Sequence, residues 1–284
     1  MTSAPDPIAS SPAAPEPAAQ PAPGASMSYV YAVGRDERAL RDAAAERPGG
    51  VALRVVTAHG LAALVADVPA EQFDERGLRA QLGDLDRLEA VARRHHDVVA
   101  SAWEHATVLP MRLATVYFDD ERAAGMLQER EEEFTSMLDW LTGQVEWGVK
   151  LYVDVRAARD TQPSPRPGTS SGRAYLQARR AARRGAAEAH GAAEDAARRI
   201  SQEAASWASA SAAHRPQQGD LATGPGENIV NWAFLVPAEH GERFRRAVQD
   251  AAGVVPGVRL EITGPWAPYS FATPDDSGRA QGGP

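Results

Sequence analysis

The stretch VALRVVTAHGLAALVADV, residues 51–68, contains two apolar runs separated by a turn sequence. The runs at 51–57 and 61–68 are rich in valine, leucine and alanine, and Ala58-His59-Gly60 between them ends in the glycine that tight turns require. This pattern predicts a β-hairpin.

The sequence on both sides of the hairpin predicts an α+β domain. We expect a strand at 29–34 and a weak helix at 38–47 before the hairpin, and a long amphipathic helix at 78–106 and a strand at 111–118 after it. One stripe of the long helix is apolar and comprises Leu78, Leu82, Leu85, Ala92, Val99 and Trp103. The order strand, helix, hairpin, helix, strand is that of a split βαβ, or ferredoxin-like, sandwich.

A second α+β domain begins at 145–153, where apolar residues alternate with a mixed set. Val145, Trp147, Val149, Leu151 and Val153 share one face of the predicted strand. Trp147 is therefore expected in a core. An alanine-rich helix at 173–213 follows, then a strand at 229–236, a helix at 239–252 and a strand at 258–263.

These elements predict two domains with tails. The N-terminal α+β domain spans 29–118, a connecting helix capped by Asp119 or Asp120 lies within 119–144, and the C-terminal α+β domain spans 145–271, with a flexible loop at 157–172. The segments 1–28 and 272–284 are expected to be disordered. The first is mostly Ala, Pro and Ser, which bury too little apolar surface to offset the entropy of ordering. Met27 is an alternative start of translation.

Composition limits the classes of partner. The formal net charge is −8, which disfavours general binding to nucleic acid or anionic membranes. No run approaches the roughly 18–20 apolar residues of a membrane-spanning helix. The chain has no cysteine, which excludes disulfides, thiol catalysis and cysteine-ligated metals and fits a reducing cytosol.

No common catalytic motif is present in the sequence. The nearest approach to a reactive cluster is His95-His96-Asp97 in the predicted long helix. His96 falls on the apolar stripe, His95 lies at its border, and neighbouring helical residues diverge by about 100°, so they cannot chelate one ion together. A core or capping histidine is favoured over a ligand or general base. We expect no catalytic residue, no metal and no cofactor.

Arg112 places a charge on the apolar face of the predicted strand at 111–118. A desolvated guanidinium needs an acidic partner. Either an internal carboxylate pairs with it and joins strand to helix, which is favoured, or Arg112 contacts another protein.

The segment GPWAPYSF, residues 264–271, combines two prolines with three aromatic residues, Trp266, Tyr269 and Phe271. It predicts either a lid that closes the second sheet or a rigid aromatic hook for a partner protein.

Six blocks of sequence follow one another between residues 29 and 271. They are Tyr29-Val30-Tyr31-Ala32-Val33; His96-Asp97-Val98-Val99 with 108–117; 145–150; 171–176 with Arg179; 231–236; and 260–271. Together they resemble the gas vesicle protein F/L (GvpF/GvpL) family, in an actinobacterial type of sequence. That family often has Phe-Gly where Leu113-Ala114 stands, and a second proline at Ala267, which leaves the subtype open.

The resemblance implies a two-domain α+β protein whose second domain is a modified ferredoxin-like unit with a long helix. It also implies a cytoplasmic assembly factor or minor component of gas vesicles that contacts the hydrophobic shell protein and other accessory proteins, without catalysis. Arg112, Trp266, Tyr269 and Phe271 are then the candidate partner-binding residues. Two alternatives remain: an enzyme that uses His96 or His105, and a ferredoxin-like sensor that binds a small ligand between its domains.

Overall fold

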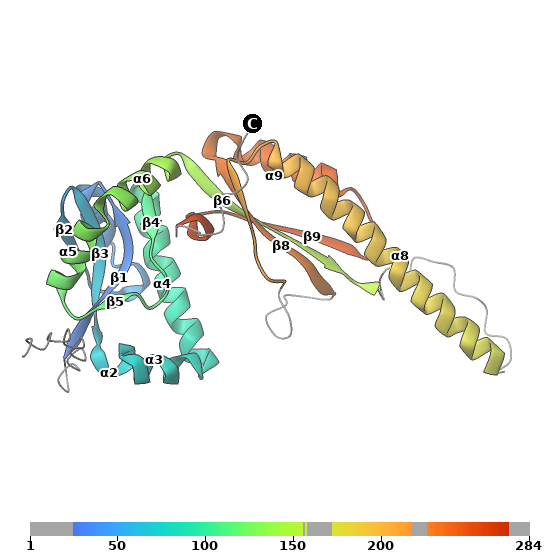
Figure 1. Ribbon diagram of the computed structural model, residues 1–284, viewed down its shortest axis with the longest axis horizontal. Helices are drawn as coiled ribbons and strands as arrows, with labels where there is room; N and C mark the ends of the chain where they lie inside the picture. The colour runs from blue at the N-terminus through green and yellow to red at the C-terminus, as the bar shows by residue number, and fades with distance from the viewer. Residues whose placement is uncertain (1–24, 156, 158–171, 217–225, 273–284) are drawn as a thin grey trace, which may run out of the picture.

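The computed structural model describes residues 25–155, 157, 172–216 and 226–272 (Figure 1). The predicted tails, apart from 25–28 and Ala272, and most of the predicted loop at 157–172 lie outside the described residues. The described chain forms two α+β units, each built on an antiparallel sheet. No helix among these residues has the length and apolar character needed to cross a membrane.

The first sheet is formed by β1 (Ser26–Gly34), β2 (Leu53–Ala58), β3 (Leu61–Pro69) and β4 (Val108–Pro110), with β5 (Val116–Tyr117) also paired to β1. The strand order is β2-β3-β1-β4, and all pairs are antiparallel. The predicted hairpin is confirmed: Ala58 pairs with Leu61, and His59 and Gly60 between them both have positive φ, as a two-residue hairpin turn requires.

The first strand begins earlier than the sequence predicted. β1 starts at Ser26, and Met27 and Ser28, placed in the disordered tail, are buried and pair with β3. This start could not be recognised after the Ala/Pro-rich segment, because Ser26-Met27-Ser28 alone shows no periodic pattern of apolar residues. Met27, the alternative start of translation, therefore lies inside an ordered strand.

Helices cover one face of the first sheet: α1 (Glu37–Ala45), α2 (Ala70–Phe73), α3 (Glu75–Leu82) and α4 (Leu85–His105), with the short η1 (Pro48–Gly50). The single helix predicted over 78–106 is wrong. Asp84 lies between α3 and α4 with an extended backbone, and its carboxylate accepts from the Arg87 N–H as an N-cap. The predicted stripe is also shifted, since Leu85 is 73% exposed and His95, Val98, Val99 and Ala102 form the buried face.

The predicted connecting helix packs on the first sheet. It is two helices, α5 (Asp120–Glu129), capped by Asp119 as predicted, and α6 (Glu131–Leu141), which meet at Arg130. Leu127, Phe134 and Leu138 lie in one core cluster with Val30 and Val33 of β1. The first sheet is therefore covered on both faces.

The second sheet has the strand order β7-β8-β6-β9, again antiparallel, the same arrangement as the first. Its strands are β6 (Gln144–Val153), β7 (Ala210–Ala213), β8 (Glu227–Pro237) and β9 (Val258–Trp266). Its helices are α8 (Gly172–Ala205) and α9 (Gly241–Ala252), and η3 (Ala238–His240) precedes α9. The helix predicted to reach 213 ends at Ala205, because the last of these residues form β7. The mixed helix and sheet fold is as predicted.

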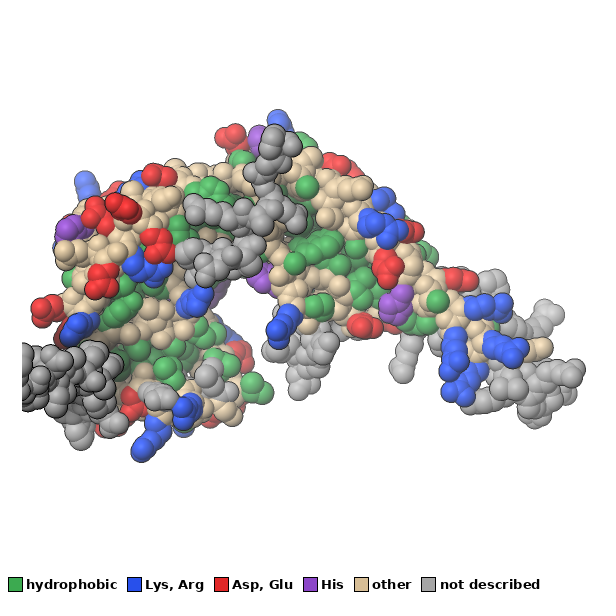
Figure 2. Space-filling model, viewed as in Figure 1, with side chains coloured by type: hydrophobic (Ala, Val, Ile, Leu, Met, Phe, Trp, Pro, Cys, Tyr) green, Lys and Arg blue, Asp and Glu red, His purple; other side chains and the backbone are tan. Residues whose placement is uncertain are grey.

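The two faces of the second sheet differ. α8 and α9 cover one face (Figure 1). Trp147, Phe234 and Phe244 pack together in that core, which confirms the predicted place of Trp147. The other face carries Glu146 and Lys150 and turns toward the first unit. The molecule is hollowed on its lower side between the two units (Figure 2).

Candidate functional site

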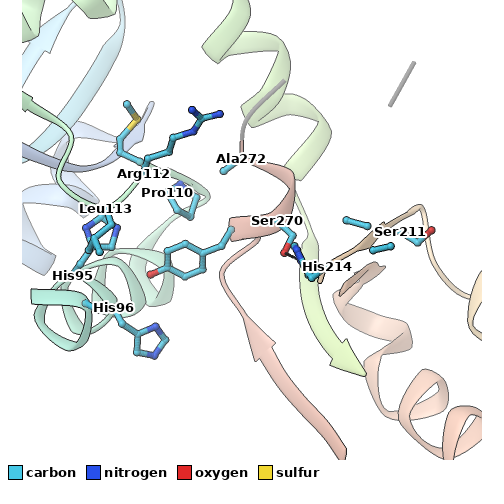
Figure 3. Close-up of a pocket in the computed structure, with 14 residues that line it drawn as sticks. His95, His96, Pro110, Arg112, Leu113, Ser211, His214, Ser270 and Ala272 are labelled. Atoms are coloured by element: carbon cyan, nitrogen blue, oxygen red, sulfur yellow. Dashed lines mark hydrogen bonds between the residues drawn. The ribbon is translucent and has the colours of Figure 1, made fainter. Parts of the chain in front are cut away.

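A groove lies between the two units and has a volume of about 820 Å³ (Figure 3). Four parts of the chain line it: α4, the segment after β4, the strand β7 with its following residue, and the C-terminal segment, residues 264–272. The lining residues are Ala92, His95, His96, Pro110, Met111, Arg112, Leu113, Ser211, Ala212, Ala213, His214, Tyr269, Ser270 and Ala272. We call this feature the inter-unit groove.

His95 lies in the wall of the groove that the first unit forms, and a chain of hydrogen bonds holds its ring in place. The Ala114 N–H donates to the Tyr29 hydroxyl, which lies 2.9 Å from His95 Nδ1. Burial lowers the pKa of His95 to about 4, and the neighbouring His96 adds to this effect, while the Met111 backbone opposes it. His95 is thus a neutral core residue. The sequence predicted that His96 lies on the buried face, but in the structure His95 is buried and His96 is only partly buried.

His96 and Tyr269 bring the two units into contact. Their rings stack with centroids 6.2 Å apart, and Trp266 meets His96 edge to face at 5.4 Å. Trp266 stays 41% exposed. His96 therefore has aromatic neighbours on two sides, as a packing residue does.

Arg112 is not in a strand, and the favoured internal ion pair is not found among the described residues. β4 ends at Pro110, and the chain turns through Ala114, whose φ is 62°, before β5 begins at Val116. Arg112 is exposed on this turn and pairs with no carboxylate among the described residues. Its neighbour Leu113 is 39% exposed, although both lie in the groove.

Ser270 and His214 line the wall of the groove that the second unit forms, and the buried Glu146 binds Ser270. The Ser270 N–H and hydroxyl donate to the two carboxylate oxygens of Glu146, each at 2.7 Å. His214 Nε2 lies 2.9 Å from the Ser270 oxygen (Figure 3). Burial raises the pKa of Glu146, and the bonds from Ser270 oppose this. Because the Ser270 proton points to Glu146, His214 donates to the serine oxygen and does not activate it as a base.

This wall could not be predicted from the sequence. Glu146 and Ser270 are 124 residues apart, and His214 directly follows β7, whose residues were predicted as helix. Alanine-rich sequence has high helix propensity, which masked β7. The only local signal was the place of Glu146 on the mixed face of its predicted strand.

The C-terminal segment ties the units together. Ala267 and Tyr269 pack against the core that contains β1 and α4, and Phe271 packs in the cluster that contains α5 and α6. Phe271 is 7% exposed and meets Trp140 edge to face. Gly264, with φ 122°, allows the bend, because an added Cβ would lie 2.7 Å from the Glu146 carbonyl oxygen. The aromatic residues of this segment thus pack against the first unit of the same chain.

The groove has the chemistry of a binding surface. Arg112 is the one permanent charge among its 14 lining residues. Within the described part of the chain, no three histidine, aspartate or glutamate side chains gather as metal ligands. A cation beside an exposed leucine and aromatic rings is suited to binding a partner that carries a carboxylate and apolar groups.

Comparison with known proteins places the chain in a family. The sequence model of "Gas vesicle synthesis protein GvpL/GvpF" matches residues 27–273. Gas vesicle protein L of Streptomyces sp. (strain CB03234) is 42% identical over 249 residues, which are 87% of this chain and 92% of the relative. Gas vesicle protein F of the same strain is 30% identical over 253 residues, or 86% and 98%.

Two crystal structures share the fold. GvpF from Anabaena sp. PCC7120 superposes with a TM-score of 0.59 at 18% identity, covering 88% of this chain and 97% of that one. GvpF from Microcystis aeruginosa gives 0.55 at 15% identity, covering 87% and 99%. The sequence match over nearly all described residues and the shared fold agree, and the chain belongs to the gas vesicle protein GvpL/GvpF family.

Proposed function

We propose that this chain is a non-catalytic assembly factor or minor structural protein of gas vesicles, which binds the hydrophobic shell protein and other accessory proteins in the cytoplasm. The family supports a role in gas vesicles. The observation that carries the binding role is the inter-unit groove, in which Arg112 is exposed and pairs with no carboxylate of the described chain.

The arrangement of side chains favours binding over catalysis. His95 is buried and neutral, His96 packs against the rings of Trp266 and Tyr269, and His214 donates to Ser270. His105 lies at the end of α4, where it pairs with Glu46 at 3.2 Å and does not line the groove. A general base needs access to a substrate proton, and these contacts occupy the candidates. No cofactor is needed for the proposed role.

The physical need for such a protein follows from the shell subunit. A subunit that polymerises through apolar surface aggregates when that surface is free. A partner with a groove that offers apolar contacts and one cation can hold such a subunit until it is added to the shell. We assign this contact to Arg112 and Tyr269, which line the groove, and to Trp266, which is 41% exposed and contacts His96 of the groove. Phe271 is buried, so we assign it a structural role and not a contact with a partner.

Binding of purified shell protein and of each accessory protein to the immobilised full chain tests the proposal. Arg112→Glu should weaken capture by about tenfold or more, because it reverses the one permanent charge among the described residues that line the groove. The matched control is Arg243→Glu on the exposed side of α9, which should bind like the wild type. If the wild type captures none of these proteins, the proposed function fails.

A small-ligand sensor is the second candidate, because the groove lies between the two units and has the size of a ligand site. A sensor should show a rise in melting temperature with a small carboxylic acid and no capture of vesicle proteins.

A further inference from the structure

The strand β7 is an edge of the second sheet with one side unpaired among the described residues. It pairs with β8 only, and the His214 N–H that follows it donates to the Asn231 carbonyl at 2.8 Å. Main-chain groups of an antiparallel strand point alternately toward and away from the partner strand. The N–H and C=O groups of Ala212 therefore point toward β8, as the N–H of His214 does. The N–H and C=O groups of Ser211 and Ala213 point away from β8.

Apart from its short length of 4 residues, β7 carries none of the features that protect sheet edges. Natural edges carry charges, prolines or bulges that prevent further pairing. β9, the other edge of this sheet, has Arg259, Glu261 and Pro265. β7 has the sequence ASAA, and Ser211 and Ala213 are exposed. Small side chains leave the main chain open to another strand.

This unprotected edge opens into the inter-unit groove. Ser211, Ala212 and Ala213 line the groove together with Arg112 and Leu113 of the first unit. The free edge offers main-chain hydrogen bonds, and Arg112 offers a charge-assisted hydrogen bond to a carboxylate.

The titratable groups around the groove leave Arg112 as its dominant charge. His95 is neutral, His96 is packed between Trp266 and Tyr269, and His214 contacts Ser270. Both oxygens of the Glu146 carboxylate are already bonded to Ser270. The field in the groove therefore favours an acidic side chain.

We propose that the inter-unit groove binds an extended peptide segment of a partner gas vesicle protein, which adds as a strand to the outer edge of β7 and directs a carboxylate to Arg112. This rests on the proposed function and names the site and mode of its partner contact. Strand addition takes affinity from main-chain hydrogen bonds and specificity from one or two side chains. The volume of about 820 Å³ is within the usual range for a bound ligand and suits a few residues of such a segment.

Proline substitution tests the edge directly. Ala213→Pro removes the outward N–H and no hydrogen bond to β8, whereas the control Ala213→Val keeps that N–H. With purified shell protein or an accessory vesicle protein, Ala213→Pro should lower affinity by about tenfold or more, and Ala213→Val by less than about threefold. If Ala213→Pro does not fold by circular dichroism, Ser211→Pro replaces it, with Ser211→Val as its control.

Hydrogen exchange on the wild type needs no variant. A bound partner should slow exchange at the Ser211 and Ala213 amides by about tenfold or more. If a vesicle protein binds while these amides stay unprotected and Ala213→Pro binds as tightly, the strand-addition site is wrong and the proposed function stands. If the amides are protected in the chain alone as its concentration rises, with a dimer in sedimentation, a second copy occupies the edge and the inference is overturned.

If no vesicle protein binds the wild type, the proposed function fails, and the edge is tested with a capped heptapeptide, VTVDVTV. Protection of the Ser211 and Ala213 amides by this peptide, lost when its Asp is replaced by Lys, supports the site. No protection at millimolar peptide overturns it.

Discussion

Ser270 binds both carboxylate oxygens of Glu146, through its backbone N–H and its hydroxyl, each at 2.7 Å. Glu146 lies on β6 of the second sheet, and Ser270 lies between Tyr269 and Phe271, which pack on the first unit. One buried carboxylate therefore fixes the segment that joins the two units.

Glu146→Gln should loosen this junction, because an amide NH₂ would face one of the two Ser270 donors. We expect a loss of about 1–3 kcal/mol in the free energy of unfolding, together with faster hydrogen exchange at residues 267–272. Ser270→Ala removes one of the two bonds and should have a smaller effect, and Ser211→Ala, on the exposed edge, almost none. Urea unfolding curves for Glu146→Gln that coincide with the wild type would refute this role.

His95 should make stability fall as the pH is lowered. Its pKa is about 4 in the folded state, against an ordinary value of 6.5, so between these values the unfolded chain binds a proton that the folded chain does not. From pH 7.5 to 5, the free energy of unfolding should fall by about 2 kcal/mol more in the wild type than in His95→Gln. The raised pKa of Glu146 acts in the opposite direction but is common to both proteins, so it cancels. Equal pH slopes for the two proteins would show that His95 does not titrate in this way.

Phe271→Ala and Trp266→Ala should differ in their effects on the free energy of unfolding. Phe271 is buried, and Phe271→Ala should cost about 3–5 kcal/mol. Trp266 is 41% exposed, and Trp266→Ala should cost about 1 kcal/mol or less while it weakens capture of vesicle proteins. Chemical denaturation and pull-down of the two variants side by side measure both effects. A large stability loss for Trp266→Ala would place this residue in the core and not in the contact surface.

Ala114→Gly should stabilise the fold. Ala114 has φ 62°, a region that is costly for an L side chain and easy for glycine. Relief of this cost outweighs the added freedom of the unfolded chain, so we expect a gain of about 0.5–1 kcal/mol. Ala90→Gly, at an exposed position inside α4, is the control and should destabilise by about that amount. A loss of stability in Ala114→Gly would contradict the strain argument.

The sequence predicted the parts of the fold that repeat a local pattern. The hairpin around His59 and Gly60, the Asp119 cap and the buried place of Trp147 all rest on alternation, turn chemistry or capping. The break at Asp84 and the strand β7 were missed, because a cap inside an apolar period and a short alanine-serine strand both resemble continuous helix.

Less of the candidate site could be predicted from the sequence. Arg112 was singled out as a charge on the apolar face of a strand, but it lies exposed on a turn that depends on the left-handed conformation of Ala114, which no apolar pattern marks. The role of Glu146 depends on Ser270, a contact 124 residues away. Such pairings arise from the packing of the two units.

Gas vesicle formation in a strain that lacks this chain tests the account most directly. Electron microscopy should show vesicles restored by the wild-type gene and by Arg243→Glu, and few or none with Arg112→Glu, although all three proteins fold with the same melting temperature. The account requires the groove cation for partner binding, so full restoration of vesicles by Arg112→Glu would contradict it.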